Sequence, residues 1–230
     1  PNIKIKAAGL ALAVIAKFIN KKSVKGKLVF AWTVQELING KGIESVINQY
    51  GPFDKIYRFN RFLDSDYIGT DQIIVNEKFY KDESNIIKAK PILSFRNSAS
   101  NIDFDKLKIH EIGIASKYSN SPVEMIAIND VINLISYITN SQKIQLTHYY
   151  DFPDKKKQKK TLFKSYSEYE SILGELINKY GVSTSENSVR NNIIKKLPSW
   201  AEPIVDEMGN LILTFGEGEN HKVFVAHMDE

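Results

Sequence analysis

The chain of 230 residues contains no cysteine. This absence excludes a disulfide framework and a metal site built on thiolates, so any bound metal would need His, Asp and Glu ligands. A chain without cysteine is compatible with the reducing cytoplasm. We therefore expect a cytoplasmic protein, although other compartments would also tolerate this composition.

Long apolar segments are missing as well. The most apolar segment, Ala7 to Phe18, is too short to cross a membrane, and no small-residue cleavage site of a signal peptide follows it. We predict a buried helix there, and no membrane partner. With 43% hydrophobic residues, the chain can bury a substantial core, which is typical of a soluble globular protein of one or two domains.

Positive charge is in small excess, with a formal net charge of +4. Most lysines are scattered, and only Lys155 to Lys160 forms a concentrated basic run. Such a run is usually a solvated loop and less often a patch for nucleic acid or an anionic membrane. The aromatic residues do not alternate with basic ones as on nucleic-acid platforms, so we expect no nucleic-acid partner. A basic surface-binding module that uses this run is a weaker alternative.

Apolar runs of strand length alternate with helical patterns through most of the chain. The patterns predict helices at 7–19, 42–49, 103–110, 130–138, 167–179 and 186–197, strands at 27–34, 55–59, 73–75, 90–95, 112–115 and 223–226, and a strand pair at 204–215. This alternation predicts an α/β fold with a mainly parallel sheet and helices on both faces. Because proline cannot donate to a strand ladder, Pro91 favours an edge position for the strand at 90–95.

The character of the chain changes between Thr139 and Lys164. This segment has few aliphatic residues and contains Pro153 and the lysine run. We interpret it as a linker or surface excursion between two structured parts, residues 1–138 and residues 165–230.

The last ten residues join a buried-strand pattern to side chains that commonly bind metals. Val223 to Ala226 is apolar, and His227, Asp229 and Glu230 follow it. In an open α/β sheet, ligands bind at the edge where such strands end. A neutral imidazole is a good zinc ligand, and a carboxylate two residues later can orient it or bridge to a second ion. A solvated Asp-Glu pair at a strand end is the simpler interpretation of the same residues.

Residues 226–230, Ala-His-Met-Asp-Glu, resemble the first metal-site motif of the glutamyl-aminopeptidase (tetrahedral aminopeptidase) family of dizinc metallopeptidases. Upstream residues at 180–183, 186, 189–190 and 206–212 are similar to the opening segment of that family. The resemblance implies a zinc-exopeptidase-like fold, two zinc ions, and hydrolysis of peptide substrates at their N-termini, and it leaves a homo-oligomer open. It also implies that His227 binds zinc and that Asp229 orients its imidazole.

The first part of the chain resembles the opposite end of the same family. Residues 32–36, Trp-Thr-Val-Gln-Glu, are similar to the family's Phe-Thr-Val-Gln-Glu-Glu strand end, and residues 112–124 are similar to its closing Ile-Gly-Ile-Pro-x-Arg-Tyr-x-His-Ser-Pro-x-Glu segment. The family's order is therefore reversed here, which indicates either two tandem copies cut across their junction or a circular permutation. The chain begins without methionine and ends on a motif that its relatives continue, so we expect a fragment of a longer protein.

At several positions where the family has zinc ligands, this chain has residues that bind zinc poorly or not at all. Glu36 stands where the family has its catalytic base, which takes a proton from the metal-bound water. Leu37 replaces the neighbouring metal-binding glutamate, and Asn120 replaces the metal-binding histidine before Ser-Pro. Shorter matches place Asn60 and Lys4 at two further carboxylate positions. Since each zinc ion keeps about four ligands, the first part is predicted to be a degenerate C-terminal half of the peptidase domain, and the second part its N-terminal portion.

Two functions from different classes fit these residues. The first is a metal-dependent aminopeptidase-like protein, in which His227 and Asp229 belong to a zinc site and Glu36 is the base. The second is a non-catalytic scaffold or interaction protein that kept the fold after losing zinc. The four replacements predict that this chain by itself does not catalyse hydrolysis.

Overall fold

The computed structural model describes residues 3–35, 40–59, 73–76, 89–92, 107, 109–114, 128–147, 171–172, 174–176, 178–179 and 181–229. Its helices are α1 (Ile3–Phe18), the 3-10 helix η1 (Lys21–Ser23), α2 (Lys41–Tyr50), α4 (Ile128–Gln142) and α6 (Asn187–Lys196). Its strands are β1 (Lys27–Thr33), β2 (Lys55–Phe59), β3 (Ile73–Asn76), β4 (Ala89–Ile92), β5 (Ile109–Ile114), β6 (Ile204–Val205), β7 (Leu211–Phe215) and β8 (His221–His227).

All these strands belong to one eight-stranded sheet, in the order β4-β3-β5-β2-β8-β1-β7-β6. Four of the seven pairs between described strands are parallel, and the antiparallel pairs lie toward the two edges of the sheet. The predicted α/β class with a mainly parallel sheet is therefore confirmed. The strand that contains Pro91, β4, lies at the edge of the sheet, as its proline predicted.

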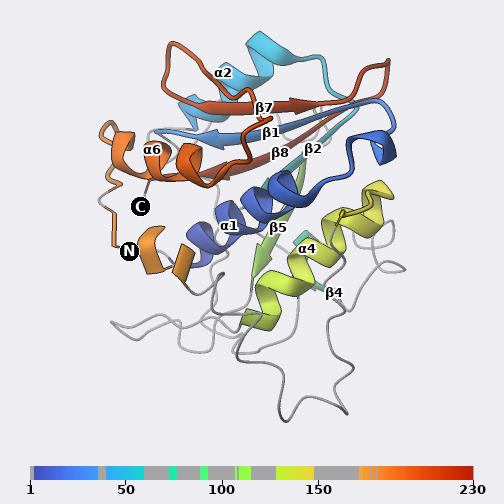
Figure 1. Ribbon diagram of the computed structural model, residues 1–230, viewed down its shortest axis with the longest axis horizontal. Coiled ribbons are helices and arrows are strands. Elements are labelled where there is room, and N and C mark those ends of the chain that lie inside the picture. Colours follow the sequence, from blue (N-terminus) through green and yellow to red (C-terminus); the bar gives the residue numbers. More distant parts are fainter. Residues whose placement is uncertain are drawn as a thin grey trace.

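Strand β8 is inserted between β1 and β2, and it runs parallel to both (Figure 1). Its pairing with β1 extends from Lys27↔His221 to Thr33↔His227. Strands from residues 1–138 and from residues 165–230 therefore share one sheet. The assignment of these two parts to halves of a peptidase domain stays a prediction.

Helices cover both faces of the sheet, as predicted (Figure 1). Along β1, Phe30 and Trp32 point to the face covered by α1, α4 and α6, whereas Val29 and Ala31 point to the face covered by α2. This is the alternation that a strand buried on both sides requires. The rings of β8 and its neighbours pack tightly, since the Phe224 ring centroid lies 4.5 Å from that of Tyr57 and 5.7 Å from that of Phe30.

Helix α1 is buried on nearly all sides, as its sequence predicted. Leu10, Leu12 and Ile15 are each 0% exposed. Although they point in different directions around the helix, they are all covered, because the sheet lies on one side and α4 and α6 lie on others. In the part of the chain that the structure describes, no helix has the length and apolarity that a membrane crossing needs.

Two sequence predictions differ from the structure. The predicted helix at 103–110 is wrong at its end, because Ile109 and His110 belong to β5; residues 101–106 and 108 lie outside the described residues. The polar residues His110 and Glu111 interrupt the apolar pattern that would have predicted this strand. A tertiary contact stabilises them in the sheet, because Glu111 accepts a hydrogen bond from buried Arg58 on β2 at 3.1 Å. Helix α4 also runs on to Gln142, into the predicted linker, and residues 148–164 with the lysine run lie outside the described residues.

Strand β8 also carries one unfavourable charge pair. Lys222 lies directly opposite Lys55 of β2 in the ladder. Burial, together with repulsion from Lys55, lowers the pKa of the Lys222 ammonium, while Asp54 opposes this effect. The unfolded chain holds this proton up to the ordinary value of 10.5, so the folded protein gains stability as the pH rises from the lowered pKa toward that value.

We expect Lys222→Gln to raise the free energy of unfolding at pH 7 by about 0.5 kcal/mol, because it removes a like-charge cross-strand pair. It should also flatten the rise of stability at alkaline pH. Urea unfolding at pH 7 and pH 10 measures both effects. Lys25→Gln, at an exposed position outside the sheet, is the matched control. Equal effects of the two variants would show that the Lys55–Lys222 repulsion is negligible.

Candidate functional site

The two strand ends that carry the predicted motifs lie side by side. Thr33, the last residue of β1, is in register with His227, the last residue of β8, and the Met228 amide donates to the Thr33 carbonyl at 2.8 Å. Parallel strands end at the same edge of a sheet, which is where ligands bind in this class of fold. Glu36, the predicted base, follows β1 by three residues but lies outside the described residues. Its proximity to His227 stays a prediction.

The carbonyl and the carboxylate of Asp229 both contact the His227 ring. Nδ1 of His227 lies 2.9 Å from the Asp229 carbonyl oxygen and 3.2 Å from Asp229 Oδ1. Both side chains are buried, at 3% and 0% exposure. The second carboxylate oxygen, Oδ2, accepts a hydrogen bond from the Ser183 hydroxyl at 2.5 Å. The carboxylate is therefore held from two sides.

This arrangement selects one tautomer of His227. Because Nδ1 faces two acceptors, it carries the hydrogen, and Nε2 keeps its lone pair when the ring is neutral. Among the described residues, Nε2 has no hydrogen-bond partner, and the buried hydroxyl of the neighbouring Thr33 has none either. A hydrogen bond from Nδ1 to a carboxylate or carbonyl oxygen is also the arrangement that metal-binding histidines share.

A loop from the second part of the chain packs over this edge. Gly181 permits the close approach, because a Cβ atom there would lie 2.9 Å from the Met228 carbonyl oxygen. Glu186, which is 4% exposed, then accepts hydrogen bonds from the amides of Gln35 at 2.9 Å and Thr184 at 3.0 Å. Gln35 has a left-handed φ of 53°, a conformation that costs free energy unless its surroundings stabilise it. Glu186 provides that stabilisation.

Asn210 fixes the end of β1 from the other side. Its Oδ1 accepts the Val34 amide at 2.9 Å, and its Nδ2 donates to the Gly42 carbonyl at 3.1 Å and to Asp206 Oδ2 at 2.8 Å. The side chain is fully buried. Gly42 is required here, since a Cβ atom would lie 2.1 Å from the Val34 carbonyl oxygen. The backbone leading to Glu36 is thereby positioned by residues more than a hundred positions away in the sequence.

The described residues do not by themselves fit a pair of zinc ions. His227 offers one ligand of the about four that each ion needs, and the Asp229 carboxylate is already bonded to His227 and Ser183. Within the described ranges, no three His, Asp or Glu side chains gather closely enough to hold a metal. Leu37, Asn60 and Asn120 lie outside these ranges. Lys4 falls on helix α1, with its side chain not described.

Sequence reasoning gave no role to three residues that build this edge. Ser183, Glu186 and Asn210 all stood in segments that resemble the peptidase family, yet their hydrogen bonds to Asp229, Gln35 and Val34 come from tertiary contacts. One sequence feature could have pointed to these three residues. Each is polar and lies in a segment that resembles the family, although the family gives it no role as a metal ligand.

Comparison with known proteins finds no match to this chain among family models, curated proteins or solved structures. The resemblance to dizinc aminopeptidases therefore rests on the motifs themselves.

We expect Asn210→Ala to lower the free energy of unfolding by about 2 kcal/mol, because it leaves the buried Val34 amide without an acceptor. Asn210→Asp should lose as much or more, since it keeps that acceptor but places a second carboxylate against Asp206. Thr214→Ala, at an exposed position on β7, is the control. Urea unfolding measures all three variants. A loss from Asn210→Ala as small as that of the control would contradict the anchoring role.

Proposed function

We propose that this chain is a dizinc-aminopeptidase-like protein that has lost catalysis and acts as a non-catalytic scaffold or interaction protein. The observation that carries the proposal is the register of Thr33 with His227, which brings the strand ends of both peptidase-like motifs to one sheet edge. A zinc-exopeptidase-like fold is expected to hold its site at such an edge.

The proposed loss of catalysis follows from the replaced zinc ligands. In the family, two zinc ions hold a hydroxide and polarise the scissile carbonyl. In this chain, His227 is available as a ligand and Asp229 orients it, but Leu37 and Asn120 replace two further ligands. A leucine side chain has no lone pair, and an asparagine amide binds zinc poorly compared with histidine. Glu36 then lacks a metal-bound water whose proton it could take.

The position of β8 also bears on the reversed order of the motifs. Strand β8 fills the space between β1 and β2 and pairs with both. Two separate tandem copies would leave this strand in a domain other than that of β1. We therefore favour one circularly permuted domain over tandem copies, with His227 and Glu36 at one site.

We expect the purified protein to release no amino acid from aminoacyl p-nitroanilides in the presence of zinc or cobalt, because most ligand positions are replaced. Glu36→Gln should leave the background rate unchanged. An active dizinc aminopeptidase assayed in parallel is the positive control. Metal-dependent release that Glu36→Gln abolishes would refute the loss of catalysis.

Zinc titration tests the metal site separately from catalysis. We expect at most one weak site, with a Kd above about 1 µM, since a single imidazole supplies one ligand of about four. His227→Ala should remove this binding. His221→Ala, which changes the histidine at the opposite end of β8, is the matched control and should retain it. Tight binding that only His227→Ala abolishes would show that the chain still builds a metal centre.

A further inference from the structure

The sheet ends on a short strand with exposed apolar side chains. Ile204 and Val205 of β6 are 55% and 45% exposed, and Trp200, just before this strand, is 36% exposed. The only other large apolar side chain this exposed among the described residues is Val182, at 37%. Exposed apolar side chains that cluster on one edge usually mark a site of interaction.

The backbone of β6 presents hydrogen-bonding groups to the outside. The Asp206 amide donates to the Asn210 carbonyl, and Ile204 pairs with Ile212, so these residues direct their polar groups toward β7. Because this direction alternates along an antiparallel strand, the N–H and C=O of Val205 point away from β7. Pro203 has no N–H, which leaves Val205 as the outward donor of this edge.

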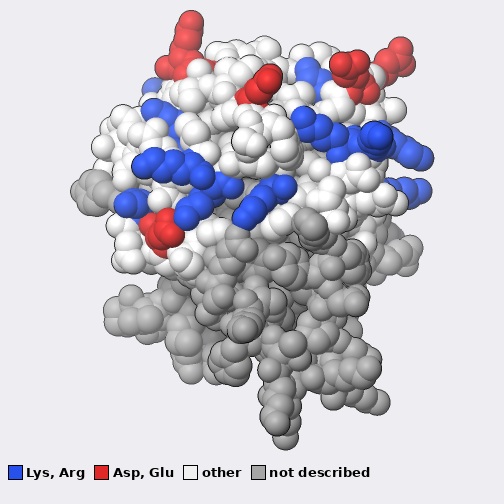
Figure 2. Space-filling model, viewed as in Figure 1, with Lys and Arg blue, Asp and Glu red and all other residues white. Residues whose placement is uncertain are grey.

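Carboxylates flank the apolar side chain on one face of this edge. Since side chains alternate, Ile204 lies on the face of its partner Ile212, which α2 covers, and Ser45 of α2 donates to Asp206 Oδ2 at 3.3 Å. Glu202 precedes Ile204 by two residues. Asp206 is also held by both nitrogens of Asn210, at 2.8 Å each, so its charge is fixed in place. Glu202 is exposed. On the face with α1 and α6, in contrast, Lys and Arg gather across the middle, and most Asp and Glu stand at the upper rim, where β7 and α2 lie (Figure 2).

A second copy of this chain is a poor partner for the edge. Antiparallel self-pairing that joins the outward groups of Val205 in both copies would place the Asp206 carboxylate of one copy opposite Ile204 of the other. The shifted register, which pairs Val205 with Pro203, would place Glu202 opposite Asp206. Like charges opposite each other destabilise a strand pair. The complementary partner carries lysine or arginine at those positions.

We propose that the β6 edge binds an extended segment of another protein, as an added strand, with an apolar residue opposite Ile204 and basic residues two positions to either side. The main chain of Val205 provides the hydrogen bonds, and Glu202 and Asp206 select the basic residues. This inference goes beyond the loss of catalysis. Strand β6 is separated from β8 by β1 and β7, so failure of the inference leaves the proposed function untouched.

Fluorescence anisotropy with a labelled peptide tests the proposal. The probe Thr-Lys-Val-Ile-Val-Lys-Thr should bind saturably, and the version with glutamate in place of both lysines should bind at least about fivefold more weakly. Val205→Pro removes the outward N–H without changing the bonds to β7, and it should weaken binding of the lysine probe about tenfold. Circular dichroism verifies that this variant keeps its fold.

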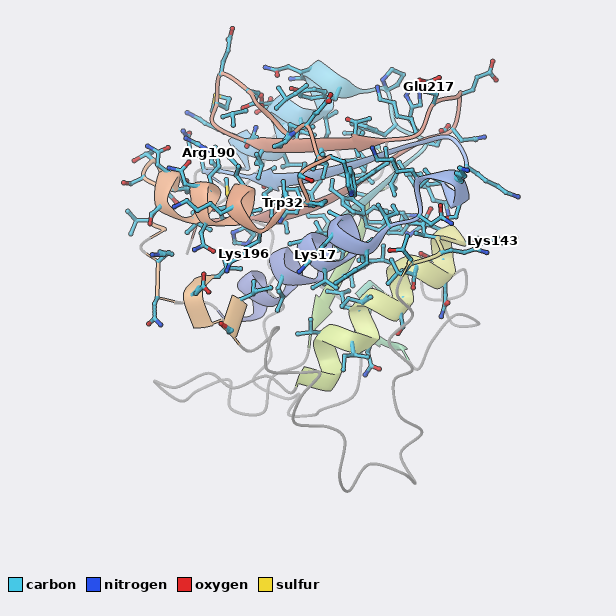
Figure 3. The ribbon with its side chains drawn as sticks, viewed as in Figure 1. Lys17, Trp32, Lys143, Arg190, Lys196 and Glu217 are labelled. Carbon is cyan, nitrogen blue, oxygen red and sulfur yellow. The ribbon has the colours of Figure 1, made fainter. Side chains whose placement is uncertain are left out.

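Charge reversal provides the matched comparison. Glu202→Lys should weaken binding of the lysine probe and strengthen binding of the glutamate version. Glu217→Lys makes the same charge change in the β7–β8 loop, at the opposite end of β7 from the turn that Arg190 contacts (Figure 3), and should change neither. Equal binding of both peptides, or no effect of Val205→Pro and Glu202→Lys, would overturn the proposal. Dimerisation that Val205→Pro abolishes, measured by sedimentation velocity, would assign the edge to a second copy instead.

Discussion

The burial of β8 between β1 and β2 is the constraint on which the rest of this structure depends. Val223, Phe224, Val225 and Ala226 are at most 1% exposed, and each side of the strand completes a parallel ladder. Burying large apolar side chains stabilises a fold by about 1.5–3 kcal/mol each, before the entropy cost of ordering the chain. Without this strand, β1 and β2 would expose their inner edges, and the ring of Phe224 would no longer join those of Phe30 and Tyr57.

The same strand decides the geometry of the candidate site. His227 leaves the sheet next to Thr33, and the chain then turns so that Asp229 reaches back to the imidazole. Glu186 and Asn210 bind the amides that follow β1, so the two strand ends are held in one arrangement. Glu186 and Asn210 are both buried and hydrogen-bonded to specific partners, and such buried networks specify one local arrangement.

The proposed loss of metal ligands is compatible with this arrangement. The apolar residues that stabilise the sheet lie within the described strands, whereas Leu37, Asn60 and Asn120 belong to segments outside the described residues. A fold does not by itself imply a function, so this core is compatible with the proposed absence of catalysis. The pair of His227 and Asp229 has a structural reason to persist, since Asp229 also binds Ser183 and closes the loop over the strand edge.

The sequence by itself determined the local elements of this protein. The strand at 55–59 was predicted with its observed bounds, and the end of helix α1 was predicted within one residue, although the helix begins four residues earlier than predicted. Apolar periodicity over a short window reports burial directly. The same periodicity wrongly predicted a helix at His110. There the buried strand β5 carries polar residues, and a hydrogen bond from Arg58 on β2 stabilises the Glu111 carboxylate. The apolar run at 223–226 also predicted that a strand leads to His227 and Asp229, and β8 contains this run. Only the tertiary structure decided that β8 lies between β1 and β2, and that Glu186 and Asn210 bind the backbone after β1. These contacts join residues more than a hundred positions apart, and no local pattern encodes which strands pair.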